Sequence, residues 1–346
     1  MSLYEEIMEQ PQSLERLIEM QWPHIREVGS ALRQQEIDTI FLTARGTSDH
    51  AGLYAKYLWG AQNGLPIALA APSLFSIYET PPRLRRSLVL GISQSGQSPD
   101  ILSVMREGRR QGMPTLAITN SPDSPLAEAA EWVIDIAAGP EEAVAATKSY
   151  TGQLVVIALL SVALSGEDDD RYDLIQRIPG WVDQALALDA EIAGIAERYR
   201  YMRESVIIGR GYNYATAFEW SLKLKELTYT VSEPYSSADF RHGPIAVMSQ
   251  GFPVFAVVPE GAVYADILSL LRGLKQDHAV ELLVISNAEE ALSIGDRGLP
   301  VPEAVPEWLT PIVGIVPAQL FVYHLAWAKG YDPNEPRGLR KVTKTE

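Results

Sequence analysis

The chain repeats itself once, and this internal repeat limits the folds that it can adopt. Three segments of the first half have counterparts in the second half, in the same order and each about 165 residues further on: 41–46 and 207–211, 88–96 and 253–261, and 115–120 and 282–287. One such pair could arise by chance, whereas three ordered pairs indicate that a single fold occurs twice.

Each half alternates short apolar runs with helical stretches. In the first half, runs of Val, Ile, Leu and Ala predict strands near 39–44, 67–70, 88–92, 115–119 and 132–136, with helices near 49–62, 98–111 and 146–164. Continuous apolar runs are typical of strands that are buried on both faces of a parallel sheet. The fold class is therefore α/β, with two doubly wound parallel sheets, and ligands are expected beyond the carboxyl ends of the strands.

The predicted domain boundaries follow from this pattern. Residues 1–36 form a helical segment that packs on the first half, 37–166 the first domain, 167–201 a connecting helical segment, 202–330 the second domain and 331–346 a tail. The last helix is expected to run from about residue 318 to 329. A tail rich in Pro and Gly is usually disordered, and its functional interpretation is a flap that crosses the active site.

Composition narrows the class of protein. Lys and Arg number 29 against 44 Asp and Glu, giving a net charge of −15, and there is no cysteine. The charge argues against binding to nucleic acid or to an anionic membrane surface. The lack of cysteine excludes disulfides, thiolate catalysis and cysteine zinc sites. The charged, amphipathic N-terminus is no signal peptide, and the most apolar stretch, 154–164, is shorter than a membrane span, so a cytoplasmic protein is expected.

Two polar turns follow predicted strands of the first half. Residues 45–49, Arg-Gly-Thr-Ser-Asp, open a helix, and their hydroxyls and free amides suit an anion, although simple helix capping by Ser48 or Asp49 is the alternative. Residues 93–98, Ser-Gln-Ser-Gly-Gln-Ser, precede Pro99 at a second helix start. Several polar side chains and a helix N-terminus converge there, which indicates a phosphate site that needs no metal, and the alternative is a polar loop with Ser98 as its cap.

Three further motifs carry candidate chemistry. Residues 141–149 could line a sugar pocket through Thr147 and backbone carbonyls, or could simply be a capped helix start. Lys223 and Glu226 lie three residues apart on one helical face, as a solvated ion pair or as a proton base with a lysine that tunes it. His242 is expected in a loop beside Gly243, where histidines often serve in acid–base chemistry, although a lone histidine is more often structural.

Seven ordered motifs resemble the tandem-domain type of the sugar isomerase (SIS) domain family, as found in the isomerase half of glucosamine-6-phosphate synthase and in stand-alone SIS-type glucosamine-6-phosphate deaminases. They are RGTSDHAG (45–52), SQSGQSPD (93–100), AVAATKS (143–149), GRG (209–211), LKLKE (222–226), FRHGP (240–244) and LRKVTKT (339–345). The resemblance covers nearly the whole chain and implies two flavodoxin-like, three-layer SIS domains.

The resemblance also implies roles for single residues. The phosphate binders would be Ser93, Gln94, Ser95 and Ser98, and the substrate contacts Gly46, Thr47, Ser48, Val144 and Ala146. Glu226 is similar to the base that moves a proton between C1 and C2. His242 is similar to a ring-opening histidine that the neighbouring subunit supplies, which implies a homodimer. Lys223 and Lys341 match positions that assist at the sugar oxygens and the open-chain form.

The implied reaction is the conversion of glucosamine 6-phosphate into fructose 6-phosphate and ammonia, with no cofactor and no metal. Arg45 and Ala146 depart from the synthases, which often carry Cys and Ser there, and no glutaminase domain is expected because there is no cysteine. The alternatives are a fructosamine-6-phosphate deglycase, an aminotransferase-type isomerase domain lacking its glutaminase, and a non-catalytic sugar-phosphate-binding regulator. The partner in each enzyme case is a phosphorylated amino sugar.

Overall fold

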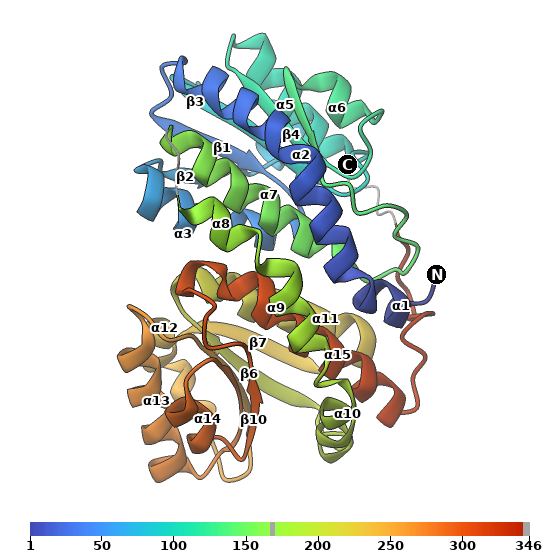
Figure 1. Cartoon of the computed structure of the whole chain (residues 1–346), viewed down its shortest axis with the longest axis vertical. Coiled ribbons are helices and arrows are strands. Elements are labelled where there is room, and N and C mark those ends of the chain that lie inside the picture. Colours follow the sequence, from blue (N-terminus) through green and yellow to red (C-terminus); the bar gives the residue numbers. More distant parts are fainter. Residues whose placement is uncertain (167–169, 342–346) are drawn as a thin grey trace. The chain divides into compact units, whose positions relative to one another are not determined.

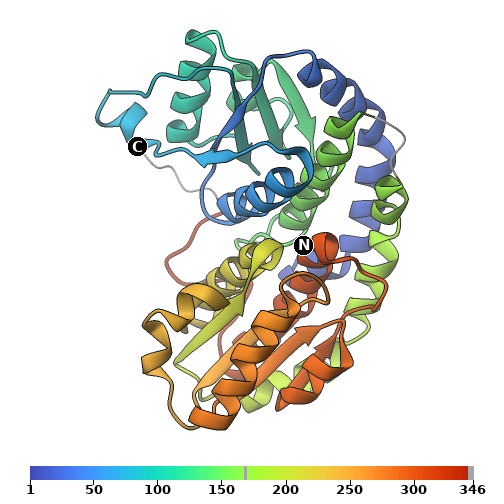
Figure 2. The ribbon, with the colours of Figure 1, turned by 90° about the vertical axis from the view of Figure 1, so that its left-hand side faces the viewer.

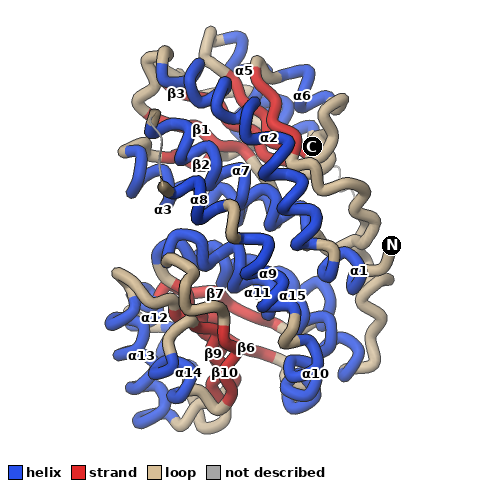
Figure 3. The backbone as a smooth tube through the Cα atoms, viewed as in Figure 1, coloured by secondary structure: helices blue, strands red, loops and turns tan. Residues whose placement is uncertain are grey.

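The computed structural model describes residues 1–166 and 170–341, which belong to two compact units. Of the described residues, the first-sheet unit comprises Gln12–Glu141, those between Lys148 and Arg177, and 340–341. The second-sheet unit comprises Met1–Pro11, Glu142–Thr147 and Ile178–Leu339. Each unit contains one five-stranded sheet with helices on both of its faces (Figure 1, Figure 3).

The two sheets share one topology. Their orders are β2-β1-β3-β4-β5 and β7-β6-β8-β9-β10, and neighbouring strands run parallel. The strands are β1 (Thr39–Thr43), β2 (Ile67–Leu69), β3 (Ser87–Ser93), β4 (Thr115–Thr119), β5 (Trp132–Asp135), β6 (Glu204–Gly209), β7 (Val231–Ser236), β8 (Pro253–Val258), β9 (Glu281–Ser286) and β10 (Arg297–Pro300). The repeated segments become β1, β3, β4 and β6, β8, β9, so the prediction of one α/β fold used twice is confirmed.

In the first-sheet unit, α3 (Thr47–Asn63) and α7 (Lys148–Ser165) cover one face and α5 (Pro99–Arg110) covers the other. Two glycines allow this close packing, because an added Cβ at Gly52 would lie 2.6 Å from Leu42 and one at Gly108 2.6 Å from Val89. The other helices of this unit are α2 (Gln10–Arg33), α4 (Ser73–Ser76), α6 (Pro125–Ala129) and α8 (Arg171–Ile175). The first two residues of α2 belong to the second-sheet unit.

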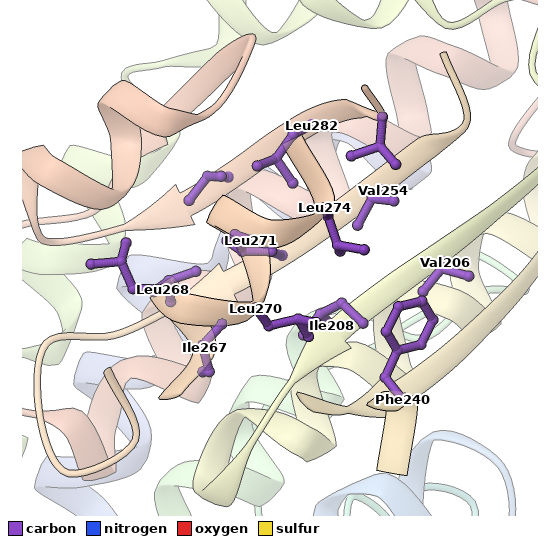
Figure 4. Packing of buried hydrophobic residues seen from close by; sticks show 14 of the residues in the cluster. Val206, Ile208, Phe240, Val254, Ile267, Leu268, Leu270, Leu271, Leu274 and Leu282 are labelled. Carbon is purple, nitrogen blue, oxygen red and sulfur yellow. The ribbon is translucent and has the colours of Figure 1, made fainter. Parts of the chain in front are cut away.

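In the second-sheet unit, α11 (Tyr214–Thr228) and α15 (Thr310–Ala328) lie on one face of the sheet and α13 (Tyr264–His278) on the other (Figure 2). Leucines of α13 interlock with the side chains of β6, β8 and β9 that point to their face (Figure 4). The shorter elements of this unit are α1 (Leu3–Met8), α9 (Ile178–Leu186), α10 (Asp189–Arg198), η1 (Gly211–Asn213), α12 (Ser237–Arg241), η2 (Pro244–Val247), α14 (Glu289–Ile294) and η3 (Glu307–Leu309).

Three boundary predictions need correction. The last helix begins at Thr310 rather than near residue 318, because Pro311 sits in its first turn and the burial of most of the helix compensates for Pro317 inside it. Helix α1 packs on α15 of the second-sheet unit, not on the first half. The connecting segment is divided, since α8 packs on α7 whereas α9 and α10 pack on α15, and the acidic residues 167–169 lie outside the described residues.

Two helices, α7 and the stretch Glu307–Ala328, are long and apolar enough to cross a membrane by length and composition alone. The apolar stretch 154–164 lies within the 18-residue helix α7, so its length does not by itself exclude a membrane span. In both helices 89% of the apolar window is buried within the structure. Core helices of soluble proteins have this property as well, so the observation is weak support for a membrane span.

Candidate functional site

The turn after β1 is shaped by a glycine. Gly46 has φ 55° and is the N-cap of α3, and no side chain caps the helix, so the alternative of capping by Ser48 or Asp49 is wrong. The buried Ser48 hydroxyl instead accepts a hydrogen bond from Nε2 of Gln153 on α7, at 3.0 Å. Thr47 and Asp49 are half-buried, and loss of hydration raises the pKa of the Asp49 carboxyl. The N–H groups of Ser48 and Asp49 bond instead to the carbonyls of Arg45 and Gly46, at 3.2 and 2.9 Å, so the turn itself closes this helix start.

An ion pair ties this turn to the start of α5. Arg45 Nε lies 2.6 Å from Oδ2 of Asp100, whose side chain is buried in the first turn of α5. The same pair recurs in the second-sheet unit, where Arg210 Nη1 lies 2.7 Å from Oδ2 of Asp266 in the first turn of α13. Burial opposes ionisation there, but hydrogen bonds from Ser237 and Arg210 hold the pKa of Asp266 below its usual value.

The loop 93–98 lies beside the β1 turn, because β1 and β3 are neighbours that end at the same sheet edge. The Ser93 hydroxyl accepts the N–H of Gly96 at 3.1 Å, which closes the loop on itself at the positive φ of Gly96. Ser98 is the N-cap of α5, but its side chain makes no capping bond. Ser95 and Gln94 are half-buried, and Gln97 is exposed. The loop thus places several hydroxyls at the start of α5, a composition that suits a phosphate.

A third group reaches the same unit from the far end of the chain. Lys341 Nζ lies 2.7 Å from Oε2 of Glu141, whose carboxylate is fully buried. Glu141 also accepts the N–H and the hydroxyl of Ser149, in the first turn of α7, at 3.0 and 2.8 Å. Glu141 therefore caps α7 and also holds the tail lysine. The tail residues 342–346, including the end of the LRKVTKT motif, lie outside the described residues.

Helix α11 buries a lysine between two carboxylates. Lys223 Nζ lies 2.6 Å from Oε2 of Glu226 and 3.3 Å from Oε1 of Glu219. The Lys223 side chain is 2% exposed and that of Glu226 is 22% exposed, so the alternative of a solvated surface pair is wrong. Burial favours the neutral amine, but the carboxylates of Glu219 and Glu226 outweigh it and raise the pKa of Lys223. The amine is thus held charged beside a carboxylate that water can still reach.

The structure does not bring His242 and Glu226 of one chain together. Gly209 at the end of β6 lies opposite Ser236 at the end of β7, and α11 returns between these strands, so Glu226 lies near the amino end of the sheet. His242 is exposed and lies, as predicted, in the turn beside Gly243 that follows α12, beyond the carboxyl end. A six-residue strand separates the two ends by about 20 Å.

The segment 142–147 belongs to the second-sheet unit. Val144 and Ala146 are half-buried, whereas Ala143 and Ala145 between them are buried. The backbone N–H groups of Glu142 and Ala143 bond to the buried carboxylate of Glu6. Burial thus alternates along the segment, and its two half-buried side chains are the two that the resemblance assigns to the sugar.

Sequence reasoning missed the acids that organise these groups. Asp100, Glu141, Glu219 and Glu6 are all buried, and each holds a lysine, an arginine or backbone amides. Only Glu219 carried a local signal, because it precedes Lys223 by four residues on the same helical face. Ser149 lies eight residues from Glu141, but Arg45, Lys341 and the amides that Glu6 accepts lie 55 or more residues from their acids, so no spacing rule could reveal those pairs.

Comparison with known proteins matches this arrangement to one family. A family model described as the SIS domain matches residues 32–163 and 202–329. A glutamine–fructose-6-phosphate aminotransferase (isomerizing) of Thermus thermophilus is 35% identical over 329 residues, which are 92% of this chain and 54% of that protein. The chain thus spans about half the length of the curated relatives that it matches.

Solved structures agree. A Silicibacter pomeroyi DSS-3 protein that was proposed to be a phosphosugar isomerase is 31% identical with a TM-score of 0.87, covering 96% of this chain and all of that one. The C-terminal domain of the Francisella tularensis glucosamine-fructose-6-phosphate aminotransferase is 29% identical with a TM-score of 0.86, covering 96% and 98%. A glucosamine-6-phosphate deaminase from Thermotoga maritima, at 21% identity and a TM-score of 0.79 over 99% of both chains, shares the fold.

Proposed function

Because this chain belongs to the SIS domain family, we propose that it is a phosphosugar isomerase that converts glucosamine 6-phosphate and water into fructose 6-phosphate and ammonia. The observation that carries the proposal is the Lys223–Glu226 pair, a partly exposed carboxylate beside an amine that is held charged. A carboxylate in such a place can take a proton from carbon, and the ammonium beside it can stabilise the negative charge that develops on a sugar oxygen.

The chemistry follows the order of proton transfers. In the open-chain sugar, Glu226 removes the proton from C2 next to the C1 aldehyde, which gives an enolamine. Return of a proton to C1 gives an imine at C2, water adds to that carbon, and the C–N bond breaks to release ammonia and leave the ketone. Loop 93–98 holds the phosphate throughout, and Lys341 interacts with the open-chain oxygens.

Ammonia release is proposed rather than glutamine-dependent synthesis because these 346 residues include no cysteine. They therefore contain no thiol nucleophile of the kind that could take the amide nitrogen from glutamine. Glu141, already bonded to Lys341, sets where the amine of that lysine lies. The pairing keeps the lysine near the sheet edge that carries the phosphate loop.

A panel of phosphorylated amino sugars tests the function. Purified protein is incubated with glucosamine, galactosamine and fructosamine 6-phosphates, and ammonia and ketose phosphate are measured together. We expect equal amounts of ammonia and fructose 6-phosphate from glucosamine 6-phosphate, with no dependence on added glutamine. Turnover of only the fructosamine substrates would assign a deglycase instead, and no turnover of any of them by folded protein would contradict the proposal.

The separation of His242 from Glu226 supports a role for His242 in the partner subunit's site, with the homodimer as the active species. We expect two inactive variants, Glu226→Gln and His242→Ala, to regain partial activity when they are dissociated and reassociated together. In a random mixture about half of the dimers are mixed, and each mixed dimer has one site with both native groups. Verified mixed dimers that stay inactive would exclude the exchange of His242.

A further inference from the structure

Helix α1 opens the chain but packs in the second-sheet unit, on α15. Its start is closed by a capping box in which the Ser2 hydroxyl and the Glu5 carboxylate bond to each other's backbone N–H groups. Both hydrogen bonds are exposed to solvent at the start of the helix. The next residue, Glu6, points the other way and is fully buried.

The Glu6 carboxylate holds one end of the segment 142–147. Its Oε1 accepts the backbone N–H groups of both Glu142 and Ala143, the latter at 3.1 Å. Hydrogen bonds to an ionised acceptor are stronger than those to a neutral one, and two of them fix the direction of the chain as it enters the segment. A neutral peptide carbonyl that accepted the same two N–H groups would bind them more weakly than this carboxylate.

The other end of the segment is reached from the same N-terminal stretch. The carbonyl of Thr147 accepts a long hydrogen bond from Nε2 of Gln319, at 3.5 Å. Gln319 in turn accepts a bond from Gln10 at 2.9 Å, and Gln10 also donates to the carbonyl of Ile7. Glu6 therefore bonds directly to the entry of the segment, whereas Gln10 reaches its exit only through Gln319.

We propose that Glu6 is a positioning residue for substrate recognition: it holds the segment 142–147 so that Val144 and Ala146 present a fixed surface to the sugar carbons. This rests on the proposed function, since the ligand is taken to be a phosphosugar. The effect should fall on the sugar and not on the phosphate, because the phosphate loop 93–98 is built by a different set of contacts in the first-sheet unit.

The experiment compares Glu6→Ala and Glu6→Gln with a matched control, Glu5→Ala, on the same helix. Glu5 is an exposed glutamate that caps α1 and has no bond to the segment. Amide hydrogen exchange of the peptide that contains residues 142–147 reports the positioning directly. The KM for glucosamine 6-phosphate and the inhibition constant for inorganic phosphate separate the sugar from the phosphate.

We expect Glu6→Ala to speed exchange at Glu142 and Ala143, since two bonds to a charged acceptor are lost. The KM should rise by about tenfold or more, because the loosened segment must then be ordered when the sugar binds. The inhibition constant of inorganic phosphate should stay within about twofold of the wild-type value, because the substitution leaves loop 93–98 untouched. Glu6→Gln keeps an acceptor oxygen without the charge and should fall between Glu6→Ala and the wild type. Glu5→Ala should match the wild type in KM.

Three results would overturn the inference. Unchanged exchange at residues 142–147 in Glu6→Ala would show that Glu6 does not hold the segment. Faster exchange with an unchanged KM would remove the segment from sugar recognition. Equal losses in sugar and phosphate affinity would indicate general loosening. The exchange measurement needs no turnover, so it decides the positioning even if the amino-sugar activity is absent, and Glu6→Gln replaces Glu6→Ala if the latter does not fold.

Discussion

Replacing Glu226 by glutamine is expected to lower kcat for ammonia release by about 10²–10⁴-fold, the range that one positioned acid–base group contributes. Glutamine keeps the shape and can still accept a hydrogen bond from Lys223, but it cannot take the C2 proton. Binding of the sugar phosphate should persist, because the loop that we assign to the phosphate lies in the first-sheet unit. The measurement is steady-state ammonia release beside the binding affinity of the inactive variant.

The fold should survive this change for a specific reason. Lys223 keeps Glu219 at 3.3 Å, so its buried charge stays paired when Glu226 is neutralised. Removing Lys223 itself would be a poorer test, since two carboxylates would then lose their cation in a buried place. Glu226→Gln therefore separates the loss of a base from the loss of structure.

Glu233→Gln is the matched control for Glu226→Gln. Glu233 pairs with Lys225 at 3.9 Å, and both side chains are well exposed. This is a surface ion pair, in contrast to the buried pair of Glu226 with Lys223. Such a pair contributes about 0–1 kcal/mol, and the control should turn over at the wild-type rate. A folded Glu226→Gln enzyme that also works at the wild-type rate would end the claim that Glu226 is the base.

Solvent deuterium gives a second test of the same step. If the Glu226 carboxylic acid exchanges its proton before returning it, wild-type enzyme in D₂O should place deuterium at C1 of the fructose 6-phosphate. Retention of the original hydrogen alone would point to direct internal return. The control variant Glu233→Gln should label the product as the wild type does.

The sheets were predictable because their signal is local. A run such as β3 is buried at every one of its seven positions and has only apolar residues and a glycine between its two end serines, and a second copy about 165 residues on reinforces the interpretation. The start of α15 was harder, since Pro317 is a breaker by local rules even though Pro311 is a favoured residue of a first helical turn. Burial along most of the helix outweighs the hydrogen bond that Pro317 removes.

The site was predictable in its residue types but not in its burial. A Lys–Glu spacing of three predicts a surface pair, and only the packed fold shows that α11 turns Lys223 inward. Glu6 and its segment lie 136 residues apart in sequence, and Lys341 lies 200 residues from Glu141. Local patterns carry no information on contacts of this range, so these acids appear only in three dimensions.

The two copies of the fold have kept one scaffold and diverged in chemistry. Both retain an Arg-Gly turn after the first strand and an aspartate in the helix after the third, joined as Arg45–Asp100 and Arg210–Asp266. The serines of loop 93–98 have no counterpart, since the second copy reads Pro-Glu-Gly-Ala after β8. The ion pair thus supports the sheet edge in each copy, whereas hydroxyl-rich anion binding is a property of the first copy alone.

Replacing Ser95 and Ser98 together by alanine is expected to raise KM for the phosphorylated sugar by about 10²–10⁴-fold. Two hydrogen bonds to a charged group are lost, each worth roughly 1.5–3 kcal/mol, and about 1.4 kcal/mol is a factor of ten. Inhibition by inorganic phosphate should weaken in parallel, because the contacts are made to the phosphate and not to the sugar. The kcat at saturating substrate should change far less than in Glu226→Gln.

The double variant should remain folded, and this makes its result interpretable. A serine that caps a helix stabilises it by about 0.5–2 kcal/mol, but the Ser98 side chain makes no capping bond, so little of that is at risk. Ser103→Ala is the control: its hydroxyl bonds to the carbonyl of Asp100 on the same helix and lies outside the loop. If the double variant unfolds at the wild-type temperature and keeps the wild-type KM, the loop holds no phosphate, and the anion must bind elsewhere at the sheet edge.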